Sequence, residues 1–455
     1  MRRPRPLTVV ALVALAAGAV VRALYALVWH PMMQFLFSDM EVYWRFARAT
    51  VDPSHRPTIE DTLFPPGAPI FFGLLSKIDG TMNLAQLVQL AMALAVPLLV
   101  YGIARELYER RVALLAMAFA SLHLPLFEYS GFFLAENPFT FFLLVAFLLL
   151  VRSLREGANA KRPALAFGLA AGVVLGVCVA FKSAALMSAL MVVLVVVGRM
   201  RWGGSQRLRA GRALAAAALG LTLLLVPLAI RATRLNEGRF CLVANEASRG
   251  ILLGHHGDDS LAKFEDYQRG YYYEFGYSTA MERGRHGVVI LNAGPWDNDR
   301  VIAEAWRWTK LHPTRSIALG FEHIFDLFIS RPWPSAGDRV LARATQLTRL
   351  GYQPILLLPA GLGLAMLLWP WRKSRPGLGA DLLVLAPIVG ICVSAFLAVG
   401  ESRYRAPFDG FLVVLSARGY VALWDAITSR IRSLRRPRPR RSRASPTPTR
   451  PDSSP

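Results

Sequence analysis

Several charged residues of this sequence stand at the ends of long apolar runs. Ionisable groups close to a membrane are costly to keep and are therefore candidates for function. Charged residues from separate segments that meet at one face of the membrane would form a reaction or binding site. A channel would instead need polar groups along its whole depth. The candidates are Asp39, Glu41, Glu136, Lys182 and the segment Glu401–Arg405.

Asp39 and Glu41 follow the first apolar run. A carboxylate at position 39 can take the proton of an acceptor hydroxyl as a general base, although it would also stabilise a helix N-terminus electrostatically. Glu41 has a structural explanation, because Ser38 and Glu41 match the S-x-x-E pattern of a helix capping box. Apolar residues at positions 40, 43, 44 and 47 share one helical face, which predicts a short amphipathic helix in the membrane interface.

Glu136 precedes an Asn-Pro pair that predicts a helix start, with Asn137 as the N-cap and Pro138 as the first helical residue. Glu136 would then lie just outside the helix and point into a vestibule on the outward side of the membrane. There it could either interact favourably with the helix dipole or bind a substrate. Lys182 stands at the turn between two apolar helices, where the alternative to a substrate role is snorkelling towards the interface.

Arg403 and Arg405 flank Tyr404 and lead into the last apolar run, which has Pro407 in its first turn. Two guanidinium groups beside a helix N-terminus make a favourable site for an oxyanion or a phosphate. The alternative is a pair of interfacial anchors with a tyrosine of the aromatic belt. Glu401 completes this polar segment.

Other polar motifs predict no metal site. The Asp297-Asn298-Asp299 sequence lacks the Gly-rich strand–turn–helix of a nucleotide-binding domain and is interpreted as a polar turn before a helix. Adjacent histidines such as His255 and His256 point opposite ways in a strand, so the His-His-Gly-Asp-Asp segment is a weak metal candidate. The three cysteines are too scattered for a disulfide framework or a zinc site.

The elements that position these residues are transmembrane helices. The chain has 455 residues, 54% of them hydrophobic and 18% charged, and a mean hydropathy of +0.38. Several apolar runs reach the ~18–20 residues that a bilayer crossing needs. The first of them is too long for a signal-peptide core and lacks a cleavage site, so we expect it to be retained. The clearest runs are Leu7–Val28, Leu84–Ala104, Ala213–Ile230, Ile355–Trp369 and Leu382–Val399.

The net charge of +22 is concentrated in short loops and in the tail Arg430–Arg450. Short basic loops mark the cytoplasmic side of a membrane protein, so this charge indicates topology rather than nucleic-acid binding. The tail is rich in Pro, Ser and Thr, which favours a disordered topology anchor at 426–455 over a binder of anionic lipid or nucleic acid.

Consecutive cytoplasmic loops must be joined by an even number of crossings, so residues 112–151 and 163–198 are each predicted to form a hairpin. The result is an α-helical polytopic protein with about ten spans and both termini in the cytoplasm. The predicted regions are an N-terminal transmembrane region (1–230) with a first outward loop (30–82), an outward segment (231–350) and a C-terminal transmembrane region (351–425). The outward segment is expected to be mixed α/β, with helices at Arg300–Leu311 and Thr314–Ile329.

The order, spacing and common sidedness of these motifs resemble the GT-C class of membrane glycosyltransferases. The resemblance is to family 39, the protein O-mannosyltransferase-like and lipid A aminoarabinose transferase-like enzymes, and it runs along most of the chain. The similar segments are Ser38-Asp39-x-x-x-Tyr43, Phe64–Pro69, Ala135–Phe139, Gly168–Lys182, Asn245–Gly254, His312-Pro313 and Glu401–Pro407. Asn245–Gly254 departs from the family's usual Asn and Gly residues, which puts the substrate in doubt more than the fold.

The resemblance implies an inverting transfer of a sugar from a polyprenyl-phosphate donor to a hydroxyl of a lipid, glycan or protein acceptor, on the extracytoplasmic face of the cell membrane. Asp39 would be the general base, and Lys182, Arg403 and Arg405 would stabilise the leaving phosphate. Glu136 would orient Lys182 or the acceptor, while Glu41, Glu401 and Tyr404 would contribute to substrate binding. No cofactor is implied as obligatory, although a divalent cation is compatible with the chemistry.

Two other classes remain open at the level of the sequence. A transporter or lipid flippase would favour polar breaks inside its spans and repeated halves. A non-catalytic assembly subunit would keep the fold without the reaction.

Overall fold

Ten apolar helices form the body of the molecule within the residues described by the computed structural model, which are 6–36, 39–155, 161–200, 206–257, 259–267, 270–277, 280–281, 284–329, 353–368 and 378–435. They occupy the places of the ten predicted spans. Seven of the helices in this part of the chain are long and apolar enough to cross a membrane, and the others are shorter. The ten are α1 (Pro6–Leu24), α4 (Asn83–Leu107), α5 (Arg110–Leu122), α6 (Glu136–Arg155), α7 (Lys161–Phe181), α8 (Ala185–Met200), α9 (Gln206–Leu235), α15 (Leu358–Leu368), α16 (Leu378–Leu397) and α18 (Asp409–Arg435).

The helices α7 and α9 pack closely because of glycines spaced four residues apart along α7. A side chain at Gly172 would collide with the carbonyl oxygen of Ala217 on α9, and one at Gly176 would meet Leu224. Small residues at this spacing let two helix backbones approach within a membrane. The Gly-rich helix predicted from the sequence is therefore the packing face that places the Lys182 turn at the end of α7.

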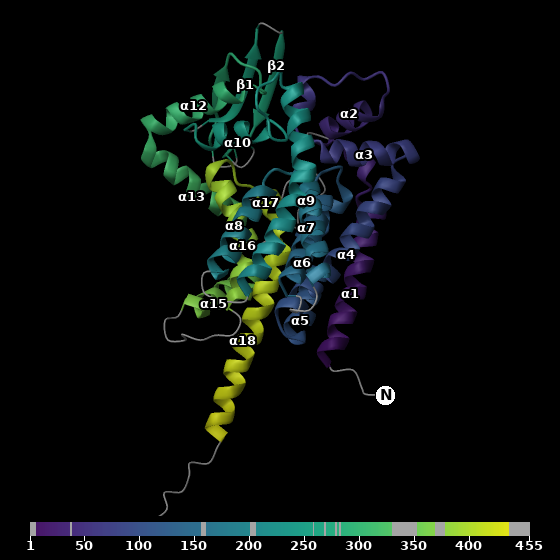
Figure 1. Ribbon diagram of the computed structural model, residues 1–455, viewed down its shortest axis with the longest axis vertical. Coiled ribbons are helices and arrows are strands. Elements are labelled where there is room, and N and C mark those ends of the chain that lie inside the picture. The colour runs from purple at the N-terminus through teal and green to yellow at the C-terminus, as the bar shows by residue number, and fades with distance from the viewer. Residues whose placement is uncertain are drawn as a thin grey trace, which may run out of the picture.

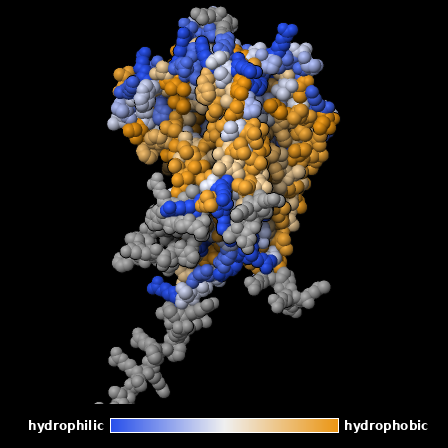
Figure 2. Space-filling view, viewed as in Figure 1, coloured by the Kyte–Doolittle hydropathy of each residue, from blue (hydrophilic) through white to orange (hydrophobic). Residues whose placement is uncertain are grey.

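Polarity is distributed as expected for a membrane protein. Figure 2 shows an apolar band around the helices, with polar residues gathered above it and at the lower end of the molecule. The first residue of α1, Pro6, and the last of α18, Arg435, both lie at the lower end, away from the strands (Figure 1). The disordered tail was predicted to start at residue 426, but α18 continues to Arg435. The remainder of the tail lies outside the described residues, as do residues 331–350 and the basic loop at 372–375.

The polar end is built from two segments that are distant in sequence. The first outward loop contributes α2 (Asp39–Val51) and α3 (Gly67–Ile78), which lie across the upper end of the bundle (Figure 1). The second contributes α10 (Glu246–Gly254), β1 (Asp259–Asp266), β2 (Tyr271–Gly276), β3 (Gly287–Leu291), α12 (Asn298–Leu311) and α13 (Pro313–Ile329). The sheet has the order β2-β1-β3, with β1 antiparallel to β2 and parallel to β3. The mixed character and both predicted helices are confirmed.

Arg249 on α10 fastens these two segments together. Its side chain is fully buried and donates to the Leu63 carbonyl oxygen at 2.5 Å and to the Tyr273 hydroxyl at 2.9 Å. The guanidinium group also lies over the Phe64 ring, 5.2 Å from its centroid. Asn245 adds a hydrogen bond of 2.7 Å to the Thr62 hydroxyl. A buried charge needs such partners, so the strand region is held firmly on the first outward loop.

Candidate functional site

Four charged residues from four separate elements form a chain of ion pairs at the polar end of the bundle. Arg403 donates to an Asp39 carboxylate oxygen at 2.8 Å, and its Nε lies 3.3 Å from Glu136 Oε1. Lys182 Nζ lies 2.9 Å from the same Glu136 oxygen. The sequence had singled out all four residues, and the structure brings them together. We call the set Asp39, Glu136, Lys182 and Arg403 the charge cluster.

Asp39 is the first residue of α2, and its side chain is the most exposed member of the charge cluster, at 31%. The helix buries Met40, Tyr43 and Ala47 against the bundle, as the amphipathic pattern predicted. Of the two carboxylate oxygens of Asp39, it is Oδ2 that accepts the hydrogen bond from Arg403. Because the carboxylate is reachable from solvent, it has the access that a base acting on an acceptor hydroxyl requires. Ser38 lies outside the described residues, so the predicted capping box stays a prediction, and Glu41 is exposed.

Glu136 is almost completely buried, at 1% exposure. The predicted helix start was wrong by a residue or two, because α6 begins at Glu136 itself. Asn137 does not cap the helix; its side chain donates to the Gln89 carbonyl oxygen on α4 at 2.8 Å. This contact across to α4 explains the difference, because it takes the Asn137 side chain away from the start of its own helix. Glu136 Oε2 has no hydrogen-bond partner among the residues that the structure describes, which leaves an acceptor at the base of the charge cluster.

Lys182 lies in the turn between α7 and α8, and α3 presses against that turn. A side chain at Gly67, the first residue of α3, would come within 2.6 Å of the Ala180 carbonyl oxygen. Only glycine allows this approach, which accounts for the Pro-Pro-Gly segment before α3. The Lys182 ammonium also lies over the Tyr404 ring, 4.9 Å from its centroid, a cation–π contact that holds the charge near Arg403.

Arg403 and Tyr404 belong to the short helix α17 (Ser402–Arg405), which precedes α18. The Arg403 guanidinium lies 5.2 Å from the Tyr404 ring centroid. Glu401 is buried immediately before α17. The predicted segment therefore brings Arg403 and Tyr404 to the charge cluster.

Arg405 bonds elsewhere. It donates to Asp409 Oδ1 at 2.9 Å and to the Leu327 carbonyl oxygen near the end of α13 at 2.8 Å. Asp409 is fully buried and lies 2.8 Å from His123 Nε2. We call Arg405, Asp409 and His123 the buried triad. The contacts described here separate Arg405 from the charge cluster, in which the sequence-based hypothesis had placed it.

Glu246 is a site residue that the sequence reasoning missed. It is half-buried at the start of α10, and its charge is felt by residues of the site. Burial raises the pKa of Tyr43 well above its usual value, and the carboxylates of Glu246, Glu136 and Asp39 raise it further. The Tyr43 phenol therefore remains protonated. The departures in Asn245–Gly254 gave no signal that the charge of a carboxylate there would act on Tyr43 and Tyr404.

The two discounted motifs have structural partners. Asp297 caps α12 and forms an ion pair with Arg239 at 3.2 Å, which confirms the polar turn. His255 lies 2.6 Å from the Ser316 hydroxyl, whereas His256 lies 2.6 Å from Asp259, so the two rings serve different contacts.

An apolar cavity of about 160 Å³ opens among helices that include α6, which carries Glu136, and the two helices joined by the Lys182 turn. It is lined by α6, α7, α8, α9 and α16, including Ala185 and Ser188, which follow Lys182 by less than two helical turns. A cationic turn above an apolar cavity suits a molecule with an anionic head and a hydrocarbon tail.

Comparison with known proteins gives a family match to part of the chain and a fold for most of it. Residues 76–234 match the family described as dolichyl-phosphate-mannose-protein mannosyltransferase. This stretch contains Glu136 and Lys182 but neither Asp39 nor Arg403. No curated protein sequence matches the chain.

Similar solved structures belong to an archaeal enzyme. The oligosaccharyltransferase AglB of Archaeoglobus fulgidus, in complex with an inhibitory peptide and a dolichol-phosphate, shares 14% identity over 93% of this chain and 51% of its own, with a TM-score of 0.53. The oligosaccharyltransferase of the same organism in complex with Zn and sulfate shares 12% identity over 92% of this chain and 50% of its own, with a TM-score of 0.52. The chain thus spans about half the length of these enzymes, and at such identities the likeness shows the fold. The family match over residues 76–234 and this shared fold confirm the resemblance seen in the motifs, which is to the GT-C class of membrane glycosyltransferases and to family 39 within it.

Proposed function

We propose that the chain is an inverting glycosyltransferase that moves a sugar from a polyprenyl-phosphate donor to an acceptor hydroxyl on the extracytoplasmic face of the membrane. The observation that carries this proposal is the position of the charge cluster. Two cations, Lys182 and Arg403, lie beside a partly exposed carboxylate, Asp39, and an apolar cavity lies between the helices next to the Lys182 turn. The cations and the cavity suit the phosphate and the hydrocarbon tail of the donor, and the carboxylate suits the hydroxyl of the acceptor.

In the proposed reaction, Asp39 takes the proton of the acceptor hydroxyl as its oxygen attacks the anomeric carbon. The new carbon–oxygen bond forms on one face of the sugar while the bond to the lipid phosphate breaks on the other, so the configuration inverts. The phosphate leaves with the bonding electron pair. Lys182 and Arg403, which now pair with Glu136 and Asp39, exchange these partners in part for the phosphate oxygens and stabilise the charge that develops there.

The acceptor and the side of the membrane rest on supporting arguments. Part of the chain matches a protein mannosyltransferase family, and the similar archaeal enzyme is in complex with an inhibitory peptide and a dolichol-phosphate. These findings support a protein or glycan acceptor and a lipid-phosphate donor. Basic loops at the end opposite the charge cluster support an extracytoplasmic site. We propose no obligatory cofactor, because Lys182 and Arg403 can themselves stabilise the charge of the leaving phosphate.

The test is a transfer assay with the full chain in nanodiscs. Radiolabelled polyprenyl-phosphate sugars, including hexoses and aminosugars, are each offered with lipid, glycan and peptide acceptors. We expect one donor to release polyprenyl phosphate in equal amount to the transferred sugar, with inverted anomeric configuration by NMR. Transfer that survives EDTA would support the absence of an obligatory metal.

The same donors, sealed on one side of vesicles, separate the alternatives. Movement of labelled lipid across the bilayer without transfer would replace the proposal with a flippase. Neither transfer nor movement across the whole panel, from protein that unfolds cooperatively, would indicate an assembly subunit.

A further inference from the structure

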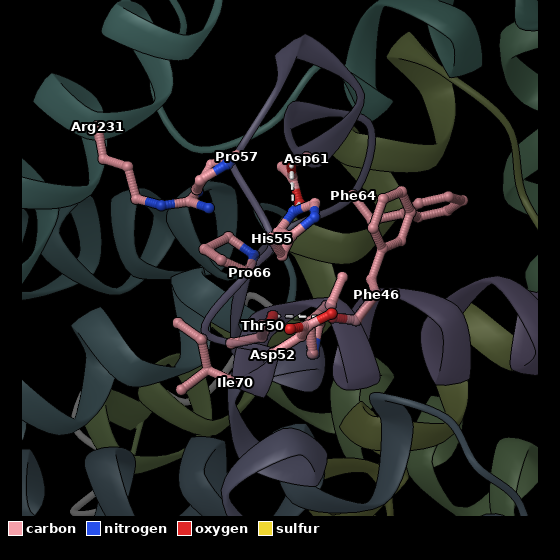
Figure 3. A pocket seen from close by; sticks show the side chains of 12 residues that line it. Phe46, Thr50, Asp52, His55, Pro57, Asp61, Phe64, Pro66, Ile70 and Arg231 are labelled. Carbon is pink, nitrogen blue, oxygen red and sulfur yellow. Dashed lines mark hydrogen bonds and ion pairs between the residues drawn. The ribbon is translucent and has the colours of Figure 1, made fainter.

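A second cavity, of about 240 Å³, lies in the first outward loop, away from the charge cluster. It is enclosed by the end of α2, the loop after it, the start of α3 and the end of α9 (Figure 3). The helix α2 carries Asp39 at its start, while Thr50 and Asp52 line this cavity at its end. At ~1.5 Å per helical residue, the cavity lies on the order of 15–20 Å along α2 from Asp39.

The walls of this cavity combine apolar faces with a few polar groups. Two aromatic rings, Phe46 and Phe64, stand on one side, Pro66 lies between them and Arg231, and Ile70 lies below (Figure 3). Rings and prolines of this kind present flat, rigid surfaces. Pockets for small molecules typically have such a lining together with a small number of polar groups that fix orientation.

Arg231 supplies unused hydrogen-bond donors at the opposite wall. Its side chain is half-buried and extends towards Pro57 and Pro66 in Figure 3. It makes neither a hydrogen bond nor an ion pair with any residue within the described ranges of the chain. A guanidinium group carries five N–H donors, so Arg231 offers a forked donor to a ligand.

The acceptors in the cavity are carboxylates. Asp52 Oδ1 accepts hydrogen bonds from the Ser54 hydroxyl at 2.7 Å and the Ser54 backbone N–H at 2.8 Å. These bonds hold the pKa of Asp52 below its usual value, so it stays ionised. His55 Nε2 lies 3.3 Å from both oxygens of Asp61. Asp52 keeps further lone pairs that can accept hydrogen bonds from a ligand.

These groups disfavour an ion of either sign. Asp52 and Asp61 repel a phosphate headgroup that Arg231 alone would attract, and Arg231 repels a cation that the carboxylates would attract. A neutral polyol satisfies both kinds of group, because each hydroxyl donates to a carboxylate and accepts from a guanidinium. A sugar ring also has an apolar face to lay on Phe46, Phe64 or the prolines.

We propose that this cavity is a saccharide subsite that holds one sugar unit of a glycan acceptor, a distance of several sugar units from the reacting hydroxyl. The assignment rests on the proposed function for its place in the reaction, whereas saccharide binding itself does not. A subsite at the far end of α2 would tether a glycan chain whose end reaches Asp39. The chain would then prefer long glycan acceptors to short ones.

Binding of fluorescently labelled neutral hexasaccharides of glucose, mannose, galactose and N-acetylglucosamine to the full chain in detergent, without donor, tests the subsite. We expect at least one to bind. Arg231→Gln should weaken that binding by about tenfold or more, since it removes charged hydrogen bonds. Arg234→Gln is the matched control, because Arg234 is exposed on the same helix and does not line the cavity.

A second pair of variants fills the space without changing charge. Ile70→Trp should abolish hexasaccharide binding by occupying the cavity, whereas Ile78→Trp, on the same helix but outside the cavity, should bind as wild type does. Normal binding by Arg231→Gln and Ile70→Trp would overturn the subsite. So would failure of every hexasaccharide to bind the wild type, or binding of phosphatidylglycerol vesicles that Arg231→Gln alone abolishes.

The two proposals can fail separately. Asp39→Asn should bind the hexasaccharide normally while losing transfer, because Asp39 does not line the cavity. Hexasaccharide binding without transfer from any donor would keep the subsite and reject the proposed reaction. A third result is that Arg231→Gln loses hexasaccharide binding and still transfers sugar to short acceptors with an unchanged KM. That result would support both the subsite and the proposed reaction.

Discussion

Arg403 and Arg405 lie on the same four-residue helix, two residues apart, and have different surroundings. Both side chains are buried to nearly the same degree, with relative exposures of 8% and 7%. Arg403 pairs with Asp39 and Glu136, carried by α2 and α6. Arg405 pairs with Asp409, four residues further along the chain, and with a carbonyl of α13. The partners differ in exposure, since Asp39 is 31% exposed and Asp409 is fully buried.

The difference shows which charges can change partners. Asp409 is fully buried and is bonded by both Arg405 and His123, so breaking one pair leaves an uncompensated buried charge. Asp39 and Arg403 meet at an edge open to solvent, where an incoming phosphate or hydroxyl can replace a partner. The charge cluster is therefore suited to substrates, and the buried triad to fixing α17 on the start of α18.

The largest effects should come from the two aspartates of this comparison. Asp39→Asn keeps the size of the side chain and removes its basicity, so turnover should fall by roughly 10²–10⁴-fold. Its unfolding temperature should match wild type. Asp409→Asn should instead lower the unfolding free energy by about 3–5 kcal/mol, because Arg405 and His123 lose a buried charged partner. Transfer assays and thermal unfolding in the same detergent measure both. Near-normal turnover of folded Asp39→Asn would remove it as the base.

The two arginines provide the next test. Lys cannot reproduce the fork with which an Arg binds a phosphate. Arg403→Lys should therefore cost about 2–4 kcal/mol of transition-state stabilisation, measured as a loss of kcat/KM. Arg405→Lys should lower thermal stability and leave turnover per folded molecule close to wild type. If Arg403→Lys matches wild type in turnover and in donor KM, the phosphate role of Arg403 is wrong. If Arg405→Lys loses turnover while keeping stability, the two arginines act together after all.

Glu128 tests the buried triad through pH. Burial raises the pKa of this carboxyl from 4.5 to about 8, although the nearby Arg405 guanidinium opposes the shift. The folded chain thus keeps a proton that the unfolded chain releases above pH 4.5, so stability falls as pH rises through this window, by up to about 1.4 kcal/mol per unit. Glu128→Gln should remove that part of the slope. Unfolding temperatures at pH 5, 6, 7 and 8 would contradict the assignment if wild type and variant ran parallel.

Much of the fold was predictable because it depends on local patterns. Apolar runs and basic loops follow from bilayer thickness and the positive-inside bias, and they placed all ten helices. The Lys182 turn and the Glu136 helix start are also local features, and both residues reached the charge cluster. The helix start was misplaced because Asn137 bonds across to Gln89 on α4, a contact that no local pattern encodes.

The separation of Arg403 from Arg405 was not predictable. It depends on which face of α17 meets α2 and which meets α13, and that is a matter of tertiary packing. Glu246 was missed for the same reason. It reaches the site because Arg249 and Asn245 fasten α10 to Leu63 and Thr62, a contact between segments almost two hundred residues apart in the chain.

Glu246 and Glu41 make the smallest and most discriminating pair, since both are acids in the first turn of a helix at the polar end. Glu41 is exposed, whereas Glu246 is half-buried and its charge reaches Tyr43 and Tyr273. Glu246→Gln should lower turnover by about tenfold, equivalent to ~1.4 kcal/mol, because it weakens the negative potential around Asp39. Glu41→Gln should stay within about twofold, as expected for a surface substitution. Kinetics of both variants at saturating donor decide the matter. Equal, small losses would show that Glu246 only begins α10, and a large loss in Glu41→Gln would mean that substrate reaches the outer face of α2.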